Sequence, residues 1–132
     1  RIYLTHAMTS KSDPEVKKAI EAHREKTITS QQKINMFSAQ IENLNTKRRR
    51  SELIENELKS LPAETTTYRA SGRMFLKAPI PSLIENIVVD RSRITSAIEV
   101  LEENKDSVIK SLNESKDSLK ELLNSKQQAQ AI

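Results

Sequence analysis

Few side chains in this sequence are placed to carry out chemistry. His6 and His23 lie far apart and the chain has no cysteine, so neither a metal site nor a thiolate nucleophile is predicted. Neither histidine has the neighbours of a serine–histidine relay, and paired carboxylates such as Glu102 and Glu103 point outward from a predicted helix. The single glycine, Gly72, excludes a glycine-rich phosphate loop. We therefore predict a protein that is not an enzyme, without catalytic residues, cofactor or metal.

One concentrated run of charge, Lys47-Arg48-Arg49-Arg50, stands out in a chain with a formal net charge of +4. Such a run is able to bind nucleic acid or to act as a nuclear import signal. No aromatic side chains accompany it for base stacking, and Glu52 and Glu55 follow within two turns. A solvated helix face is therefore the favoured interpretation, and nucleic acid is not expected as a partner.

The stretch most suited to binding is Thr65–Lys77, which has the composition of β structure. Two β-favouring runs meet at Ser71-Gly72, where glycine takes a positive φ at no steric cost, so a β-hairpin is predicted over about residues 65–77. A two-stranded hairpin alone is marginal in water, and two helices leaving its ends would not cover its apolar side chains. These side chains are Tyr68, Met74, Phe75 and Leu76. We therefore expect strands of other chains to complete the hairpin.

Two long helices must hold this hairpin. Asp13-Pro14-Glu15 is a typical helix start and Pro62 ends the helix, which predicts a first helix over about residues 14–60. Pro79 and Pro81 delay the second helix to about residue 81, and no helix breaker follows before about residue 129. The similar lengths on both sides of a hairpin predict an antiparallel coiled coil.

Both helices carry a heptad seam, defined as the line of residues that faces the other helix. The first seam comprises Val16, Ile20, His23, Thr27, Ser30, Ile34, Phe37, Ile41, Leu44, Arg48, Ser51, then Glu55 and Leu58. The second comprises Ile84, Ile87, Arg91, Ile94, Ile98, Leu101, Lys105, Val108, Leu112, Ser115, Leu119, Leu122, Lys126 and Ala129. Pairing them end to end places residue i roughly opposite residue 141 − i, to within about a turn. His23 is then a polar seam residue, and Arg48, Arg91 and Lys105 set the register or extend to solvent.

The far ends of the two helices form a second candidate surface. Beyond the polar stretch around Ser30 lies an apolar patch at helix ends that are free to fray. The patch comprises Val16, Ile20, Leu119, Leu122 and Leu123. Closing the coiled coil is the commoner role of such residues, and weak contact with apolar segments of other proteins is the alternative.

Composition limits the class of protein. With 36% hydrophobic and 3% aromatic residues, a thick globular core is not expected, whereas 30% charged residues suit long solvated helices. No apolar run approaches the roughly 20 residues of a membrane span, and without cysteine a reducing compartment is expected. The chain opens on Arg1 and its first methionine is Met8, so residues 1–7 are interpreted as either foreign or upstream sequence, within a disordered segment 1–13.

Between the two heptad helices, the motif Tyr68-Arg69-Ala70-Ser71-Gly72-Arg73-Met74-Phe75-Leu76 resembles the β-class subunits of prefoldin. The similarity covers about Pro14 to Gln130, and the order and spacing of its short motifs make it specific. The junction Ala78-Pro79-Ile80-Pro81, at the predicted start of the second helix, departs from the family pattern because it is richer in proline.

The resemblance implies both a fold and a function. In that family a subunit is one of six, two of α class and four of β class, whose hairpins assemble into a double β-barrel platform that carries coiled-coil tentacles. The complex captures non-native proteins such as actin and tubulin and passes them, without ATP, to the cytosolic group II chaperonin. By resemblance, the subunit-assembly residues are Tyr68, Gly72, Met74, Phe75 and Leu76. The client-contact residues are Val16, Ile20, Leu119, Leu122 and Leu123.

We therefore expect a mainly α fold with one domain over residues 14–132, in which a long antiparallel coiled coil is joined by a single β-hairpin that completes a multi-subunit barrel. The expected partners are other prefoldin subunits, unfolded clients and the chaperonin, with no membrane. The expected location is the cytoplasm, with the nucleus as a further site. The alternative is a structural or tethering coiled coil with weak nucleic-acid affinity.

Overall fold

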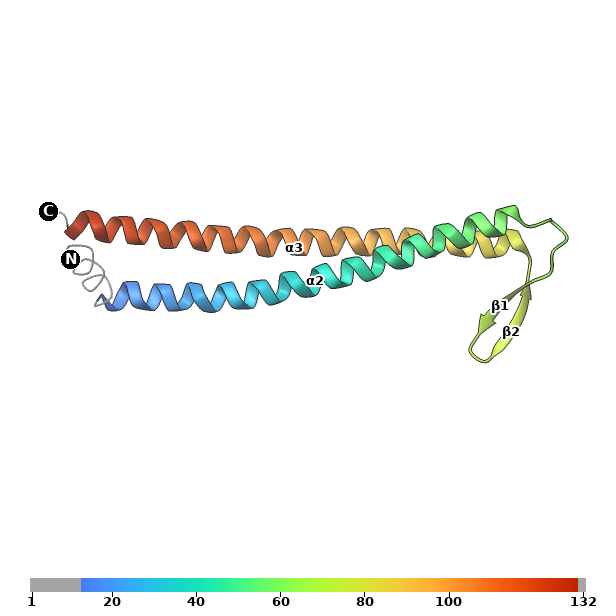
Figure 1. Cartoon of the computed structure of the whole chain (residues 1–132), viewed down its shortest axis with the longest axis horizontal. Coiled ribbons are helices and arrows are strands. Elements are labelled where there is room, and N and C mark those ends of the chain that lie inside the picture. The colour runs from blue at the N-terminus through green and yellow to red at the C-terminus, as the bar shows by residue number, and fades with distance from the viewer. Residues whose placement is uncertain (1–12, 131–132) are drawn as a thin grey trace. The chain divides into compact units, whose positions relative to one another are not determined.

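A computed structural model describes residues 13–130 as two long helices and one hairpin (Figure 1). The elements are α2 (Pro14–Ser60), β1 (Thr67–Ser71), β2 (Met74–Ala78) and α3 (Ile80–Gln130). This confirms the predicted fold of two long helices joined by one antiparallel hairpin. The segment expected to be disordered, residues 1–13, lies outside the described residues except for Asp13.

Helix α2 begins and ends where the sequence predicts. The side chain of Asp13 caps the helix, because its Oδ1 accepts the backbone N–H groups of Glu15 at 2.9 Å and Val16 at 3.5 Å. Beyond Ser60 the chain turns, and the N–H of Thr65 donates to the carbonyl of Pro62 at 3.0 Å. This turn holds residues 62–65 outside the hairpin, so β1 starts two residues later than expected.

Helix α3 begins at Ile80, one residue before the predicted start. The N–H of Leu83 already donates to the carbonyl of Pro79 at 3.2 Å. Pro81 therefore occupies the second helical position, where its missing N–H costs nothing because the first turn of a helix has no partners for its N–H groups.

The hairpin turn lies one residue later than predicted. Ser71 pairs with Met74, so the loop consists of Gly72 and Arg73. Gly72 has a φ of 61°, and no other residue of the described chain has a positive φ. A positive φ at the first loop residue alone is the pattern of a type II′ turn, which matches the twist of the strands. The predicted turn at Ser71-Gly72 is therefore wrong by one residue, and β2 runs to Ala78.

The turn provides a stability test. A Cβ atom built on Gly72 has no neighbour within 4 Å, so substitution is penalised by backbone conformation and not by a clash. We expect Gly72→Ala to destabilise the hairpin by about 1–2 kcal/mol, the cost of left-handed backbone for an L-residue. Gly72→Asn is the matched control and should cost less, because asparagine tolerates this region. Thermal unfolding of the assembled protein measures both, and equal losses for the two variants would contradict this explanation.

The chain divides into two compact units, each described here by itself. In the first unit, the part of α2 up to Phe37 packs with α3 from Asn104 onward, and Val16 and Ser30 are buried. The second unit, Ser38–Glu103, contains the hairpin, and its buried residue is Ile98 at 5% exposure. Neither unit has a thick core, as the composition predicts.

Most predicted seam residues are half-buried or buried, so the heptad assignment is largely confirmed. Thr27 and Ala129 are exposed, and Ile20 is 45% exposed while Ala19 is half-buried in its place. From Val16 the seam therefore steps by three to Ala19 and then by four to His23. Sequence periodicity favoured the larger apolar residue, but the helical angle favours the alanine.

The predicted register holds in the first unit. Asp13, expected opposite Gln128, contacts Lys126, and His23, expected opposite Ser118, contacts Ser115. In the second unit Glu55, expected opposite Asn86, pairs with Arg91, which is about one and a half turns away and exceeds the expected deviation of about a turn. Both of these side chains are long enough to reach along the helix axis.

Candidate functional site

The hairpin presents apolar side chains on both faces. Tyr68 and Phe75 are 60% and 74% exposed, and Met74 and Leu76 are 65% and 44% exposed. Directly paired residues share a face, and Ala70 pairs with Phe75 while Ser71 pairs with Met74. Tyr68 and Phe75 therefore lie on one face, and Met74 and Leu76 lie on the other. Every apolar residue predicted for subunit assembly is exposed.

The edges of the hairpin are also open. Within residues 13–130 the sheet has only two strands, so the outer edge of each strand has no strand partner. At its open end the hydroxyl of Thr67 donates to the carbonyl of Ala78 at 2.5 Å, which ties the strands together where they leave the helices. This surface is suited to added strands and apolar cover from other chains.

An ion pair links the helices of the second unit. Arg91 Nη1 lies 2.5 Å from Glu55 Oε2, and Lys59 Nζ lies 3.0 Å from Glu55 Oε1. The contacts with Arg91 and then Lys59 outweigh desolvation and hold the pKa of Glu55 below its ordinary value. The sequence assigned Arg91 to the seam but did not identify Glu55 as its partner. Two features of the sequence could have pointed to this ion pair. Glu55 occupies a heptad position, and Lys59 follows it four residues later on the same side of the helix.

The sign of this pKa shift predicts acid sensitivity. Because the folded pKa of Glu55 lies below the ordinary 4.5, its contribution is fully present above that value and is lost as pH falls through the folded pKa. We expect the stability of Glu55→Gln to fall less than that of the wild type between neutral and acidic pH. Glu57→Gln is the matched control, since Glu57 is exposed and has no ion pair with another described residue. Urea unfolding across this range checks the prediction, and parallel curves for wild type and Glu55→Gln would refute it.

The predicted client-contact residues fall into different environments in the first unit. Leu119 and Leu122 line an interhelical groove of about 310 Å³ with Ala19 and Ala22. Val16 is only 2% exposed and lies with Leu123 along a second groove of about 250 Å³. Ile20 is 45% exposed and lines neither of these grooves. Four of the five residues therefore face the gap between the helices, and Val16 becomes accessible only if the helix ends separate.

A charged clasp closes the helix ends. Lys126 Nζ lies 2.7 Å from Glu15 Oε2 and 3.3 Å from Asp13 Oδ2. The hydrogen bonds to Glu15 and then Asp13 raise the pKa of Lys126 despite some desolvation. Desolvation also opposes the charge of Asp13, but Lys126 and the backbone N–H groups of Glu15 and Val16 together lower its pKa. Asp13 and Glu15 lie before Val16, the first residue of the predicted seam, so the heptad pattern did not include them. The seam position of Lys126 was the only sequence feature that pointed to this contact.

Two other sequence features have simple structural roles. His23 Nδ1 lies 2.9 Å from the Ser115 hydroxyl, as expected for a polar residue in the seam. In the basic run Arg48 is half-buried and donates to Asn45 Oδ1 at 2.9 Å, whereas its three cationic neighbours are exposed. One helical turn distributes these four cations around α2, so they do not form a single face. Across residues 13–130 neither helix has an apolar stretch sufficient for a membrane span.

Comparison with known proteins agrees with this geometry. The sequence profile described as "Prefoldin subunit" matches residues 21–126. The chain is 33% identical over 99 residues to prefoldin subunit 1 of Mus musculus, which covers 74% of this chain and 80% of the relative. It is 31% identical over 98 residues to prefoldin subunit 1 of Homo sapiens, with the same coverage. Subunit 1 is also the β-class member that Gly72-Arg73-Met74-Phe75 most resembles.

Solved structures match the fold. The prefoldin beta subunit from Thermococcus strain KS-1 superposes with a TM-score of 0.71 at 15% identity, covering 83% of this chain and 93% of that chain. The beta2 subunit from the same strain gives a TM-score of 0.56 at 22% identity, covering 72% and 97%. The sequence profile, the curated relatives and the two-helix hairpin fold agree, and the chain belongs to the prefoldin subunit family, with the fold of its β subunits.

Proposed function

We propose that this chain is one subunit of a hetero-oligomeric chaperone that works without ATP and holds non-native polypeptides. Prefoldin subunits assemble with other prefoldin subunits, and the exposed hairpin is the observation that carries the proposal for this chain. Phe75, 74% exposed beside an open strand edge, needs cover that the described part of the chain does not supply. Strands from α- and β-class sister subunits would close the sheet into a barrel and remove its edges.

Client binding is proposed for the helix ends of the first unit. The groove formed by Ala19, Ala22, Leu119 and Leu122 offers aliphatic surface without a deep cavity. Such a surface suits weak and adaptable contact with apolar segments of many sequences. We expect the clients to include non-native actin and tubulin chains, which the complex would transfer to the cytosolic group II chaperonin. The proposed location is the cytoplasm, with the nucleus as a further site, and no enzymatic activity is proposed.

Two measurements test this function. Native mass spectrometry of the complex purified from cells should show a hexamer that contains this chain and its sister subunits. The reconstituted complex should suppress the light scattering of denatured actin on dilution, without ATP. A stable monomer that joins no sister subunit and leaves actin aggregation unchanged would instead favour a tethering coiled coil, and nucleic-acid binding through Lys47–Arg50 would then be tested by its salt dependence.

A further inference from the structure

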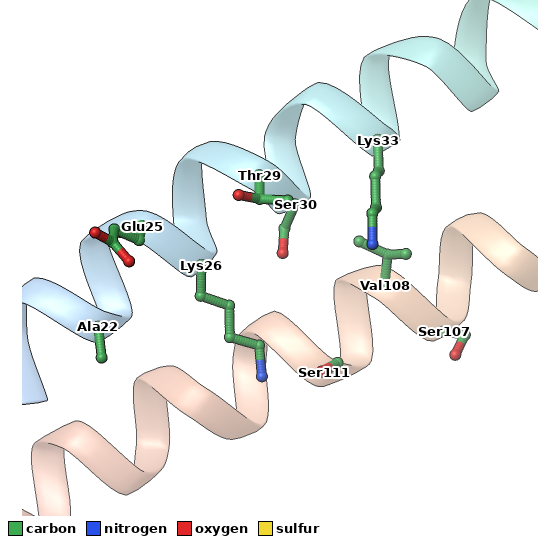
Figure 2. A pocket seen from close by; sticks show the side chains of 9 residues that line it. All are labelled: Ala22, Glu25, Lys26, Thr29, Ser30, Lys33, Ser107, Val108 and Ser111. Atoms are coloured by element: carbon green, nitrogen blue, oxygen red, sulfur yellow. The ribbon is translucent and has the colours of Figure 1, made fainter.

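A cationic groove lies between α2 and α3 in the first unit (Figure 2). It adjoins the groove at Ala19, Ala22, Leu119 and Leu122, called the aliphatic groove below. The volume of the cationic groove is about 570 Å³. Lys26 and Lys33 approach it from α2, and Ser107 and Ser111 line it from α3. The expected assembly through the hairpin makes no use of these residues, so their arrangement requires a separate explanation.

The two lysines give the groove its charge. They lie seven residues apart on one side of α2, or about 10 Å along the helix axis, and both ammonium groups point toward α3 (Figure 2). Neither forms an ion pair with another residue in the described range. Glu25 also lines the groove, but its carboxylate stays beside α2 and is not directed between the helices. The space between the helices therefore has a net positive charge.

Ser30 adds a hydrogen-bond donor between the lysines. Its side chain is only 7% exposed, and its hydroxyl points from α2 into the gap (Figure 2). We find no hydrogen bond between this hydroxyl and another residue among 13–130. Ser30 borders the open groove, so its hydroxyl is available to donate a hydrogen bond to an anionic group that lies there. A carboxylate is the chemical group that fits two ammonium groups and a hydroxyl donor.

The cationic groove continues into the aliphatic groove. Ala22 and Lys26 line both, and Leu119 and Leu122 follow directly in the aliphatic groove. A polypeptide segment bound along the first unit would thus contact both grooves. One part of it would lie on aliphatic side chains, and the adjacent part would lie beside the lysines and serine hydroxyls. Its recognition would require apolar side chains next to an acidic one.

We propose that these adjoining grooves bind segments of non-native polypeptides that combine aliphatic side chains with Asp or Glu. The aliphatic side chains occupy the groove at Leu119 and Leu122, and the carboxylate lies between Lys26 and Lys33, where it accepts a hydrogen bond from Ser30 and is attracted by both ammonium groups. This inference rests on the proposed chaperone function and adds a charge preference to it. Acidic segments bind more tightly than neutral ones, and basic segments bind least.

Three matched peptides test the preference on the reconstituted complex. The peptides are unstructured, amidated and fluorescently labelled, with the same aliphatic residues and with Glu, Gln or Lys at the intervening positions. Fluorescence anisotropy should give the tightest binding for the Glu peptide. The double variant Lys26→Glu/Lys33→Glu should weaken binding of the Glu peptide roughly tenfold, as two exposed charge pairs become repulsive. The preference should fade as added salt shortens the screening length from about 30 Å to about 3 Å.

A matched control distinguishes the groove from general charge. Lys17→Glu/Arg24→Glu makes the same charge change at the same spacing, on exposed residues of α2 that do not line the groove. It should leave the affinity for the Glu peptide within about twofold of wild type. Equal weakening by both double variants, or equal binding of the three peptides, would overturn the charge preference while leaving the chaperone function intact. If no peptide bound and actin aggregation were not suppressed, the proposed function and this inference would both fail.

Discussion

Replacing Phe75 by aspartate should prevent the chain from joining its sister subunits while leaving the isolated chain folded. Phe75 is 74% exposed in the single chain, so the substitution removes little packing within it and should change its stability by no more than about 0.5 kcal/mol. In the assembly the same side chain would be covered, and burying a phenylalanine contributes about 1.5–3 kcal/mol. A carboxylate at a covered position adds a desolvation cost. We therefore expect affinity for sister subunits to fall by at least about a hundredfold.

Size-exclusion chromatography with light scattering, with and without sister subunits, measures this loss. Val100→Asp is the matched control, because Val100 lies in the same unit and is 55% exposed on α3, away from the hairpin. Circular dichroism of both variants should retain the helical signal of the wild type. Normal assembly of Phe75→Asp would show that the hairpin is not the assembly surface, and equal defects in both variants would point to a general effect of the added charge.

Removing the helix ends should have the opposite result, in which assembly persists and client holding is lost. Trimming residues 14–27 together with residues 115–132 removes the clasp at Lys126 and the groove at Leu119 and Leu122. It retains the hairpin, the buried Ile98 and the Glu55–Arg91 ion pair, which all lie in the second unit. We expect a complex of unchanged subunit composition whose suppression of actin aggregation falls toward that of buffer alone.

Trimming also shortens the helices, so a second variant must keep their length. Replacing the same two segments by polar helix-forming sequence of equal length preserves the length of both helices but removes their aliphatic surface. Both variants should lose client holding if the apolar groups bind the client. Full holding by the polar-ended variant would contradict a role for Val16, Leu119, Leu122 and Leu123, and would assign these residues to closing the coiled coil.

Much of the fold was predictable because local signals agreed with the tertiary structure. The cap at Asp13 and the break at Pro62 define α2 through backbone hydrogen bonding, which acts over a few residues. The errors are equally local. The hairpin turn was placed one residue early, since composition locates the glycine but strand pairing decides which residue follows it in the loop.

The candidate sites were predictable only in part. Tyr68, Met74, Phe75 and Leu76 were identified because a short hairpin with several apolar side chains has no means of burying them alone. Ile20 was placed in the seam on its hydrophobicity, yet Ala19 takes that position because the helix angle, and not residue size, selects the inward face. The contact of Lys126 with Asp13 and Glu15 was missed, since the two helix ends are far apart in sequence.

The sequence by itself determined the two helices, the hairpin between them and the family, because caps, prolines, heptads and a turn glycine act through neighbouring residues. The tertiary structure alone decided which side chains meet across the helices, including the Glu55–Arg91 pair and the groove between Lys26, Ser30 and Lys33. Such contacts depend on the register and spacing of two segments that are distant in sequence. A shift of a single turn changes every cross-helix partner while leaving the heptad pattern of each helix unchanged.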